Sequence, residues 1–492
     1  MNKKLLALLL ALCLCLGCMP ALADDVPVVT YLSDAGGTTA DKDNMVLKAI
    51  EEAIGVKMDI TQIPNADFAA KLNTMIASGT LPDVIQIPLT DAVQFQDADM
   101  LLPLNDLLAQ HGSHIMAEVG DSLTAAPLNA DGEIYGIISG KTGFLNNFMI
   151  RKDWLANVGM EVPTDLDSLY DVLYAFTYND PDQNGENDTY GFMFSMANLR
   201  QLSHIFGAYH IAVDKYYELE DGTVTTYMKA PDYLNVIKYL RKLYQDGIIS
   251  PDFVTYTNMN VLELLWSGRL GVLDFYGTGT VQNWYPGRYT FEVPKNPADL
   301  FTHTLIEGPT GLKGAYKEYP NLLNYMVITS TCENPEAAMK FIDFTYSEEG
   351  DELLNFGVEG VMWDWVDEEA GLYTRLGEYT DDTIHRVNGG YVYWDEGRIA
   401  NNIELKVMRD YTREAQAHAW EHAFDYPVIL STLESEVEYG ATLSEITKEA
   451  LVQLITTEGD VEAEYAAFVE RWNNEGGLAL EAEATAAYQA QK

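Results

Sequence analysis

The chain has 492 residues, of which 75 are Asp or Glu and 30 are Lys or Arg, so its formal net charge is −45. This acid excess argues against a nucleic-acid-binding protein, which needs a basic surface, and against electrostatic binding to anionic lipid. The length predicts two or more domains, and an anionic ligand would need a local basic pocket within a repelling field.

Residues 1–23 are typical of an export signal. Two lysines precede an apolar run that ends at Leu16 and is too short for a permanent membrane span, and Ala21–Ala23 offers a small-residue cleavage site. We favour cleavage after Ala23. The alternative is a lipoprotein with Cys18 lipidated, because Leu16-Gly-Cys18 resembles the end of a lipobox. Either way, the mature protein is expected outside the cytoplasmic membrane.

Three of the four cysteines lie in this segment, so Cys332 alone certainly remains in the mature chain. No intramolecular disulfide is therefore expected, and stability must come from burial of apolar surface.

The region after the signal alternates predicted strands and helices. Strands are expected at 26–32, 56–63 and 84–87, and helices at 41–54 and 66–78, each helix being closed by a glycine, Gly55 or Gly79. This β-α-β-α-β order predicts a mostly parallel sheet with helices on both faces, and hence an α/β fold.

Further along the chain, strands are expected at 134–138 and 147–150, on either side of a glycine-bearing turn. Thr164–Asp167 reads as a capping box that starts a helix running to about Phe176. Later strands are expected at 190–194, 271–277 and 325–329, and later helices at 231–246, 259–267, 335–346 and 348–354. The last 120 residues or so are expected to be mostly helical.

The most informative motif lies between the helix ending near Phe176 and the strand starting at Tyr190. Oxygen-bearing side chains fall at positions one, three, five and nine of a tight loop, glycine falls at position six, and Glu186 would offer its backbone carbonyl at position seven. The side chains are those of Asp180, Asp182, Asn184 and Asp188. This is the ligand order of an EF-hand calcium loop. Position twelve, usually a bidentate Glu, is Gly191 here. Because the loop joins a helix to a strand, we expect a structural calcium ion and not a calcium sensor; the alternative is an acidic turn.

Several segments together resemble extracellular solute-binding proteins of sugar-importing ABC transporters, in the long branch that bears a calcium loop and includes alginate- and lipoprotein-type binders. They are the segment from Lys71 through Gly79 to Pro82-Asp83-Val84, Tyr135-Gly136, Ile150–Leu155 with Pro163-Thr164, the acidic loop 180–192, and 355–361. The resemblance covers nearly the whole mature chain. Thr189 departs from it, since some relatives carry an acidic calcium ligand there.

The resemblance implies a periplasmic-binding-protein-like fold of two α/β lobes joined by crossing hinge strands, with a sugar in the cleft between them. Lobe one would comprise residues 24–142 and 272–360, and lobe two 143–271 and 361–492. The protein would be a monomer that captures a carbohydrate, and more narrowly an oligosaccharide, and delivers it to a permease.

A sugar site needs aromatic platforms together with fixed donors and acceptors. Position relative to the implied crossings selects the candidates for ligand contact, which are Asn146, Asn147, Asp274, Tyr276, Trp284, Trp363 and Trp394. For each of them, packing in a core is the alternative.

Enzyme functions find weaker support. His418-Ala-Trp-Glu421-His422 matches an inverted zinc-peptidase pattern, but a third ligand would have to come from elsewhere. No local signature indicates the carboxylate pair of a glycosidase, a nucleophile elbow or a phosphate-binding loop. We therefore expect a non-enzymatic receptor. The alternatives are a secreted hydrolase (glycosidase or zinc peptidase) and a binder of peptides or another solute on the same fold.

Overall fold

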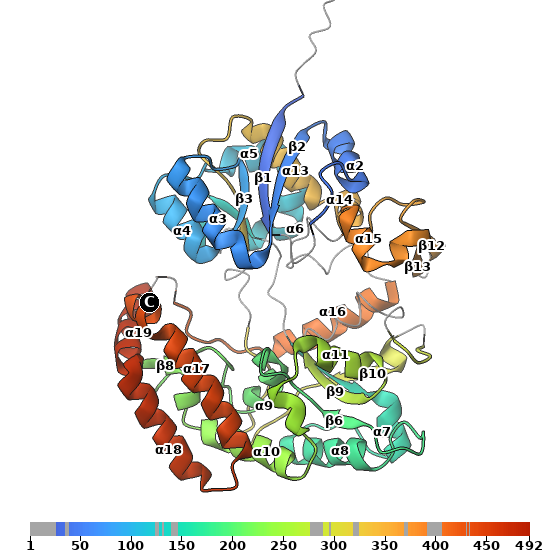
Figure 1. The fold of residues 1–492 in the computed structure, drawn as a ribbon, viewed down its shortest axis with the longest axis vertical. Coiled ribbons are helices and arrows are strands. Elements are labelled where there is room, and N and C mark those ends of the chain that lie inside the picture. Colours follow the sequence, from blue (N-terminus) through green and yellow to red (C-terminus); the bar gives the residue numbers. More distant parts are fainter. Residues whose placement is uncertain are drawn as a thin grey trace, which may run out of the picture.

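The computed structural model describes residues 26–34, 39–123, 127–129, 132–138, 146–275, 289–294, 297–317, 324–368, 372–390, 406–429, 431 and 433–492. These residues form two lobes, one above the other in Figure 1. Each lobe has its own sheet and its own hydrophobic core.

The first lobe is built on a five-stranded sheet in the order β2-β1-β3-β11-β4. Its strands are β1 (Val28–Asp34), β2 (Lys57–Ile63), β3 (Val84–Pro88), β4 (Gly136–Ile138) and β11 (Asn324–Ile328). The first three are parallel, as predicted, whereas β11 runs antiparallel to both β3 and β4. The strand contributed from far along the chain therefore joins the two halves of this sheet.

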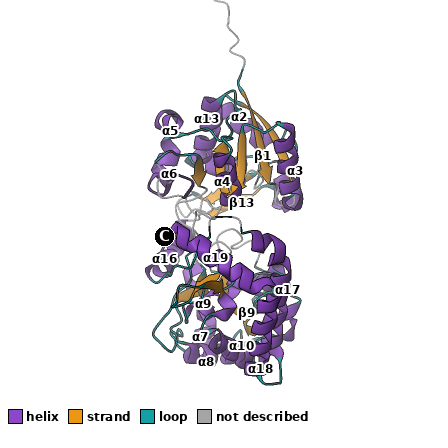
Figure 2. Ribbon diagram, turned by 90° about the vertical axis from the view of Figure 1, so that its left-hand side faces the viewer, coloured by secondary structure: helices purple, strands orange, loops and turns teal. Residues whose placement is uncertain are grey.

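Helices cover both faces of that sheet, and Figure 2 shows the strands lying between α5 and α6 on one side and α3 on the other. The helices of this lobe are α2 (Met45–Ile54), α3 (Asn65–Ser78), α4 (Leu89–Asp97), α5 (Asn105–His111), α6 (Ser113–Leu123), α13 (Pro335–Thr345), α14 (Glu348–Phe356) and α15 (Asp382–Val387). A hairpin of β12 (Trp363–Asp367) and β13 (Leu372–Arg375) lies beside α15. Gly55 and Gly79 end α2 and α3 with φ of 67° and 66°, which confirms the predicted helix ends.

Asp83, in the Pro-Asp segment that begins β3, ties that strand to β1. Its Oδ2 accepts hydrogen bonds from the backbone N of Thr30 at 2.8 Å and from the Thr30 hydroxyl at 2.7 Å. The Thr30 hydroxyl oxygen in turn accepts from the Asp83 backbone N at 2.8 Å. Part of the family-like signature thus has a structural role in this lobe.

The second lobe contains a four-stranded sheet in the order β10-β5-β9-β6. Its strands are β5 (Asn147–Arg151), β6 (Tyr190–Phe192), β9 (Leu270–Phe275) and β10 (Phe301–Thr304), and a small hairpin pairs β7 (Tyr216–Glu218) with β8 (Val224–Thr226). The helices are α7 (Lys152–Val158), α8 (Leu166–Tyr178), α9 (Ser203–Gly207), α10 (Tyr233–Gln245), α11 (Asn258–Trp266), α16 (Lys406–Glu421), α17 (Glu434–Thr456), α18 (Val461–Trp472) and α19 (Leu478–Gln491). All five residues of β5 are buried, since this strand lies inside the sheet and between layers of helices.

Helix α8 begins one residue later than the predicted capping box. Its N-cap is Asp165, whose side chain accepts from the backbone N of Ser168 at 2.8 Å. Asp165 also forms an isolated parallel bridge with Glu307, in which the Thr164 carbonyl accepts from the backbone N of Glu307 at 2.8 Å, so Thr164 lies before the helix start. The box is therefore Asp165 with Ser168, and the prediction of Thr164 with Asp167 is wrong by one position.

The two cores divide the chain at different points from those that the resemblance implied. Strand β9, which spans the expected boundary at 272, lies inside the second sheet, and Tyr316 belongs to the second core. Trp363 belongs to the first core, and Asp41 donates its backbone N–H to the carbonyl of Val387. Among the described residues, the lobes therefore comprise 26–138 with 324–390, and 146–317 with 406–492. No helix in this described part is both long and apolar enough to cross a membrane.

Candidate functional site

The sheet of the second lobe meets the first crossing between the lobes at Asn146, directly before β5. There the side-chain nitrogen of Asn146 donates to Asp274 Oδ1 at 3.2 Å, to Ser203 Oγ at 3.1 Å and to the carbonyl of Arg200. Asp274 lies on the neighbouring strand β9, where it is the backbone partner of Phe148. The structure thus brings two of the predicted residues, Asn146 and Asp274, together at the foot of the crossing.

These side chains are engaged by the protein itself. Asp274 is fully buried, and its Oδ2 accepts from the backbone N of His204 at 2.7 Å. Asn146 and Asn147 are buried as well. In this conformation Asn146 and Asp274 fasten the start of β5 to β9 and α9, and direct ligand contact by Asn146, Asn147 and Asp274 stays a prediction.

Sequence reasoning missed the partners of this cluster. Arg200 and Ser203 lie 54 and 57 residues from Asn146 along the chain, and His204 lies 70 residues from Asp274. No motif in the sequence marks them, because their proximity arises only when the 3-10 turn Leu199–Leu202 and α9 pack at the end of β9.

Of the aromatic candidates for ligand contact, the structure describes Trp363 alone, and it places this residue in a core. Trp363 is fully buried in the first core, where its Nε1 donates to the carbonyl of Gly357 at 3.0 Å and its ring centroid lies 5.3 Å from that of Phe356. A side chain packed in this way cannot touch a ligand without leaving the core. The prediction that Trp363 contacts the ligand is therefore wrong, and its alternative, core packing, is correct. Tyr276, Trp284 and Trp394 lie outside the described residues.

The acidic loop folds so that its oxygen-bearing side chains converge. The Asn184 amide nitrogen donates to Asp182 Oδ2 at 2.8 Å and to Asp188 Oδ1 at 3.3 Å, while the backbone N–H of Asn184 donates to Asp180 Oδ1 at 3.1 Å. Gly185 adopts φ of 83°, the left-handed conformation that the sharp turn demands. Asp182 Oδ1 is buried without a hydrogen-bond partner in the described structure, and burial raises the pKa of this carboxyl group.

The end of this loop explains why position twelve is a glycine. Gly191 lies in β6 directly against α8, and a Cβ atom at this position would stand 2.2 Å from the carbonyl oxygen of Leu173. A glutamate cannot occupy that space. Thr189 is also unavailable as a ligand, because it is buried and its hydroxyl donates to the Phe176 carbonyl at 2.9 Å.

A cation of the protein already approaches the loop. Arg269 Nε donates to the carbonyl of Asp188 at 2.9 Å and lies 3.4 Å from Asp188 Oδ2. Among the described residues, no group of three His, Cys, Asp or Glu side chains is placed to hold a metal ion. In the described loop the Asn184 amide nitrogen donates to the carboxylates of Asp182 and Asp188, where a metal ion would have to lie.

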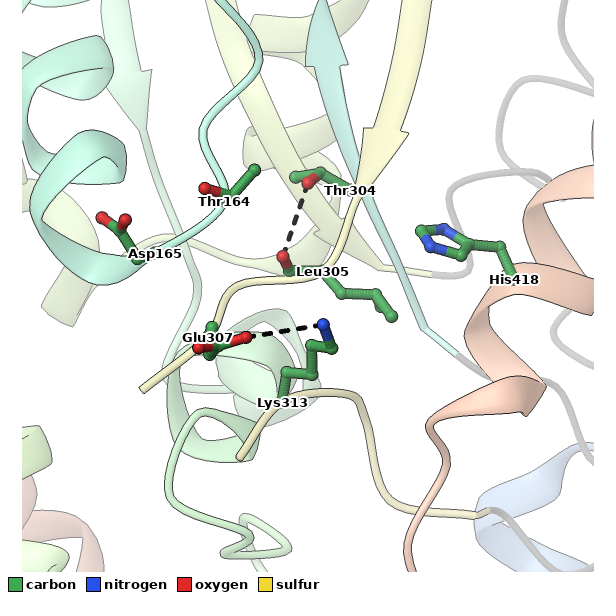
Figure 3. A pocket seen from close by; sticks show the side chains of 7 residues that line it. All are labelled: Thr164, Asp165, Thr304, Leu305, Glu307, Lys313 and His418. Atoms are coloured by element: carbon green, nitrogen blue, oxygen red, sulfur yellow. Dashed lines mark hydrogen bonds and ion pairs between the residues drawn. The ribbon is translucent and has the colours of Figure 1, made fainter. Parts of the chain in front are cut away.

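A pocket of about 320 Å³ lies where β10 ends against α16. Figure 3 shows Leu305 at its centre, the Glu307–Lys313 pair on one side and the His418 ring reaching toward it from α16. The Lys313 ammonium lies 3.5 Å from Glu307 Oε2. These two charges face each other, and the carboxylate of Asp165, which also lines the pocket, accepts from the backbone N of Ser168.

The His-x-x-Glu-His segment lies at the end of α16 beside this pocket. The rings of His418 and His422 have centroids 6.3 Å apart, and the ring of His303 lies 5.3 Å from that of His418. Burial, and next to it the neighbouring His422, lowers the pKa of His418. Burial also lowers the pKa of His303, with a smaller effect of His418. The described residues supply no third ligand that would make this a metal centre.

A profile of bacterial extracellular solute-binding proteins matches residues 36–352. The chain is 26% identical over 468 residues to lipoprotein LipO of Bacillus subtilis, covering 91% of this chain and 89% of LipO. It is 24% identical over 456 residues to the polygalacturonan/rhamnogalacturonan-binding protein YtcQ of the same organism, covering 88% and 85%.

Among solved structures, the ABC-transporter substrate-binding protein FusA of Streptococcus pneumoniae in complex with kestose superposes with a TM-score of 0.64. Its sequence is 22% identical, and the match covers 94% of this chain and 100% of FusA. An EF-hand mutant of FusA, in complex with fructo-nystose, matches with a TM-score of 0.63, 21% identity and the same coverage. This likeness shows that the two-lobed fold is shared.

Proposed function

Because the chain belongs to the bacterial extracellular solute-binding proteins, we propose that it captures an oligosaccharide outside the cytoplasmic membrane and hands it to the permease of an ABC importer. The family match, which extends over segments of both lobes, carries this proposal. The names of YtcQ and FusA support a carbohydrate as the ligand class. Two separate cores joined by chain crossings suit a protein whose lobes close on a ligand.

The proposed role is binding without turnover. Binding needs shape and hydrogen bonds, whereas hydrolysis needs two carboxylates at set separation or an activated water. No observation on the described residues favours hydrolysis, and the match to a binding-protein family supports a receptor.

The proposal includes a structural calcium ion in the loop 180–188. Asp180, Asp182, Asn184 and Asp188 would hold it through their side chains and Glu186 through its carbonyl. The buried, unpartnered Asp182 Oδ1 and the converging carboxylates support this assignment. The ion would neutralise like charges and fasten the end of α8 to the start of β6. Its binding requires the Asn184 amide to turn its oxygen toward the carboxylates.

The processing of residues 1–23 decides whether the mature protein is attached to the cell. Cleavage after Ala23 would release a monomer, while lipidation of Cys18 would tether it; the name of LipO supports the second route. The mass of the mature protein isolated from its native host, with and without a lipid at Cys18, separates the two.

Calorimetric titration of the mature protein tests the proposed function. The panel comprises kestose, nystose, maltotriose, xylotriose, mannotriose and trigalacturonate, followed by chromatography of each sugar after overnight incubation. Saturable binding of at least one sugar, recovered intact, is the expected result. Cleavage of a bound sugar, or binding of short peptides and no sugar, would replace the proposal.

A further inference from the structure

The second lobe contains another pocket, of about 370 Å³, between α17, the β7–β8 hairpin and the ends of α18 and α19. Figure 1 shows α17, β8 and α19 side by side at that edge of the lobe. Apolar groups form its floor: Leu199, Leu443, Trp472 and Leu480. Its volume falls in the lower part of the range of roughly 300–1,000 Å³ for small-molecule sites, so it suits a terminal sugar better than a whole chain.

Asp214 is the unusual residue on the wall of this pocket. Its backbone has φ of 62°, a left-handed conformation that residues other than glycine seldom adopt. Asp214 is exposed as a residue, and within the described part of the chain its carboxylate makes no hydrogen bond and no ion pair. The surrounding walls raise the pKa of Asp214 by desolvation, and the nearby charges of Lys215, Lys448 and Arg200 oppose that rise.

Two further polar groups of the pocket lack partners among the described residues. Lys448, on α17, is exposed and forms no ion pair there. The Tyr227 hydroxyl is buried without a hydrogen bond, and burial, followed by the charge of Asp214, raises the pKa of Tyr227. The pocket therefore combines an unpaired acceptor, an unpaired cationic donor and a hydroxyl above an apolar floor.

Lys215, which lines the pocket, and Arg200, whose charge acts on Asp214, also contact residues near the points where the described chain leaves or enters the second lobe. The Lys215 ammonium lies 6.0 Å from the ring centroids of Tyr316 and of Tyr426, and Tyr316 directly precedes Lys317, where the described chain leaves the second lobe. The backbone carbonyl of Arg200 accepts a hydrogen bond from the Asn146 side chain, directly before β5.

The chemistry of the pocket points to an uncharged sugar. A sugar hydroxyl can donate to a carboxylate and accept from an ammonium group, while the apolar face of the ring packs on aromatic and aliphatic side chains. The lining charges balance, since Lys215 and Lys448 face Asp214 and Glu436. A uronate would bring its carboxylate toward Asp214, in a chain whose net charge is already −45.

We propose that this pocket binds an uncharged sugar residue at one end of the ligand, with Asp214 accepting hydrogen bonds from its hydroxyls and Lys448 donating to its oxygens. This inference rests on the proposed function and specifies its substrate class.

The test compares titrations of the same sugar panel into wild-type protein, Asp214→Asn and Lys448→Met. Asparagine keeps the shape of Asp214 and tolerates the left-handed backbone, so folding should be preserved, which the melting temperature checks. Glu220→Gln, in the turn of the same hairpin, and Lys238→Met, on α10, are the matched charge controls.

Wild-type protein should bind its best neutral sugar at least about tenfold more tightly than trigalacturonate. Asp214→Asn and Lys448→Met should each weaken neutral-sugar binding about tenfold, as expected for a lost charge-assisted hydrogen bond, and both controls should stay within about twofold. If Asp214→Asn does not fold, the affinity of Lys448→Met for the neutral sugar alone tests whether the pocket binds it.

Neutral-sugar binding unchanged in both folded variants would overturn the pocket and leave the receptor intact. A wild-type preference for trigalacturonate would overturn the substrate class alone. Absence of any sugar binding would overturn the proposed function and this inference together.

Discussion

His204 Nδ1 lies 3.0 Å from Asp274 Oδ1, and both side chains are completely shielded from solvent. The same carboxylate also accepts from the His204 backbone N and from the Asn146 side chain. One carboxylate therefore joins β9, α9 and the chain segment that enters the second lobe from the first.

Replacing Asp274 with alanine should lower the free energy of unfolding by roughly 2–4 kcal/mol, because it leaves buried donors of His204 and Asn146 without an acceptor. Urea unfolding followed by circular dichroism measures the change. Asp171→Ala, on the exposed face of α8, should change stability by less than about 0.5 kcal/mol. Equal effects of the two substitutions would contradict the role given to Asp274.

Calcium should raise the melting temperature of the mature protein, and EDTA should reverse the rise, because an ion that binds only the folded state stabilises it by mass action. Asp182→Ala should abolish this response. Differential scanning calorimetry with calcium and with EDTA provides the measurement, with Asp59→Ala as a control outside the loop. If neither calcium nor EDTA changed the melting temperature of the wild-type protein, the proposed calcium site would be wrong.

The same loop should bind calcium less tightly as the pH falls. Burial raises the folded-state pKa of Asp182 above its ordinary value, so protons compete with calcium at a higher pH than at an ordinary Asp. Without calcium, the effect of pH on folding stability is the opposite one. Because the pKa of Asp182 is higher in the folded state, this group stabilises the fold at a pH below its unfolded-state pKa. That stabilisation is lost as the pH rises through the folded-state pKa. Calcium affinity measured by titration from pH 7 to pH 4 should fall, whereas Asp182→Asn in EDTA should be more stable than wild type at pH 7.

Restoring a glutamate at position twelve of the loop should damage the protein and not improve calcium binding. Gly191→Glu places a Cβ atom where the Leu173 carbonyl stands, so α8 and β6 must separate, at a cost of roughly 2–4 kcal/mol. Gly120→Ala, in α6, meets only the flexible end of Met116 and should be neutral or slightly stabilising. Chemical denaturation compares the two; a stable Gly191→Glu protein with tighter calcium binding would show that this strand can shift.

Acid should also weaken the packing of α16 on β10. The pKa values of His303 and His418 are lowered chiefly by burial, so the unfolded state binds more protons once the pH falls below the ordinary histidine value. Stability from these groups is therefore present above about pH 6.5 and is lost as the pH falls toward the folded-state pKa values. The groups facing them include Glu414, which opposes the shift at His303, together with Glu421, Lys313 and His422 around His418.

A double variant, His303→Gln with His418→Gln, should flatten the loss of melting temperature between pH 7 and pH 5. His111→Gln, on the first lobe, serves as the control. A pH profile identical in wild type and double variant would assign acid sensitivity to other groups.

Local signals in the sequence predicted the regular elements well. Glycines past the helix ends located the C-termini of α2 and α3, and the alternation of elements predicted three parallel strands of the first sheet. These features depend on backbone preferences within a few residues. The capping box was misplaced by one residue because Asp165 and Ser168 can form the same reciprocal bonds as Thr164 and Asp167, and the local pattern does not distinguish the two registers.

The site could be predicted only where its residues are close in sequence. The acidic loop spans nine residues, so its convergence was readable. The Asp274 cluster and the Asp214 pocket assemble side chains from distant segments, which neither periodicity nor motif spacing can bring together. Tryptophan suits both cores and sugar platforms, which is why Trp363 was assigned to a ligand although it packs beside Phe356.

The position of β11 between β3 and β4 has a consequence for how the polypeptide matures. The amino-terminal lobe cannot close its sheet until residues 324–328 are present, whereas every strand of the second sheet precedes them, the last ending at Thr304. Long-range strand pairing of this kind is slow. A nascent chain destined for export would thus keep its first lobe open, and competent for passage through a membrane pore, for most of its synthesis.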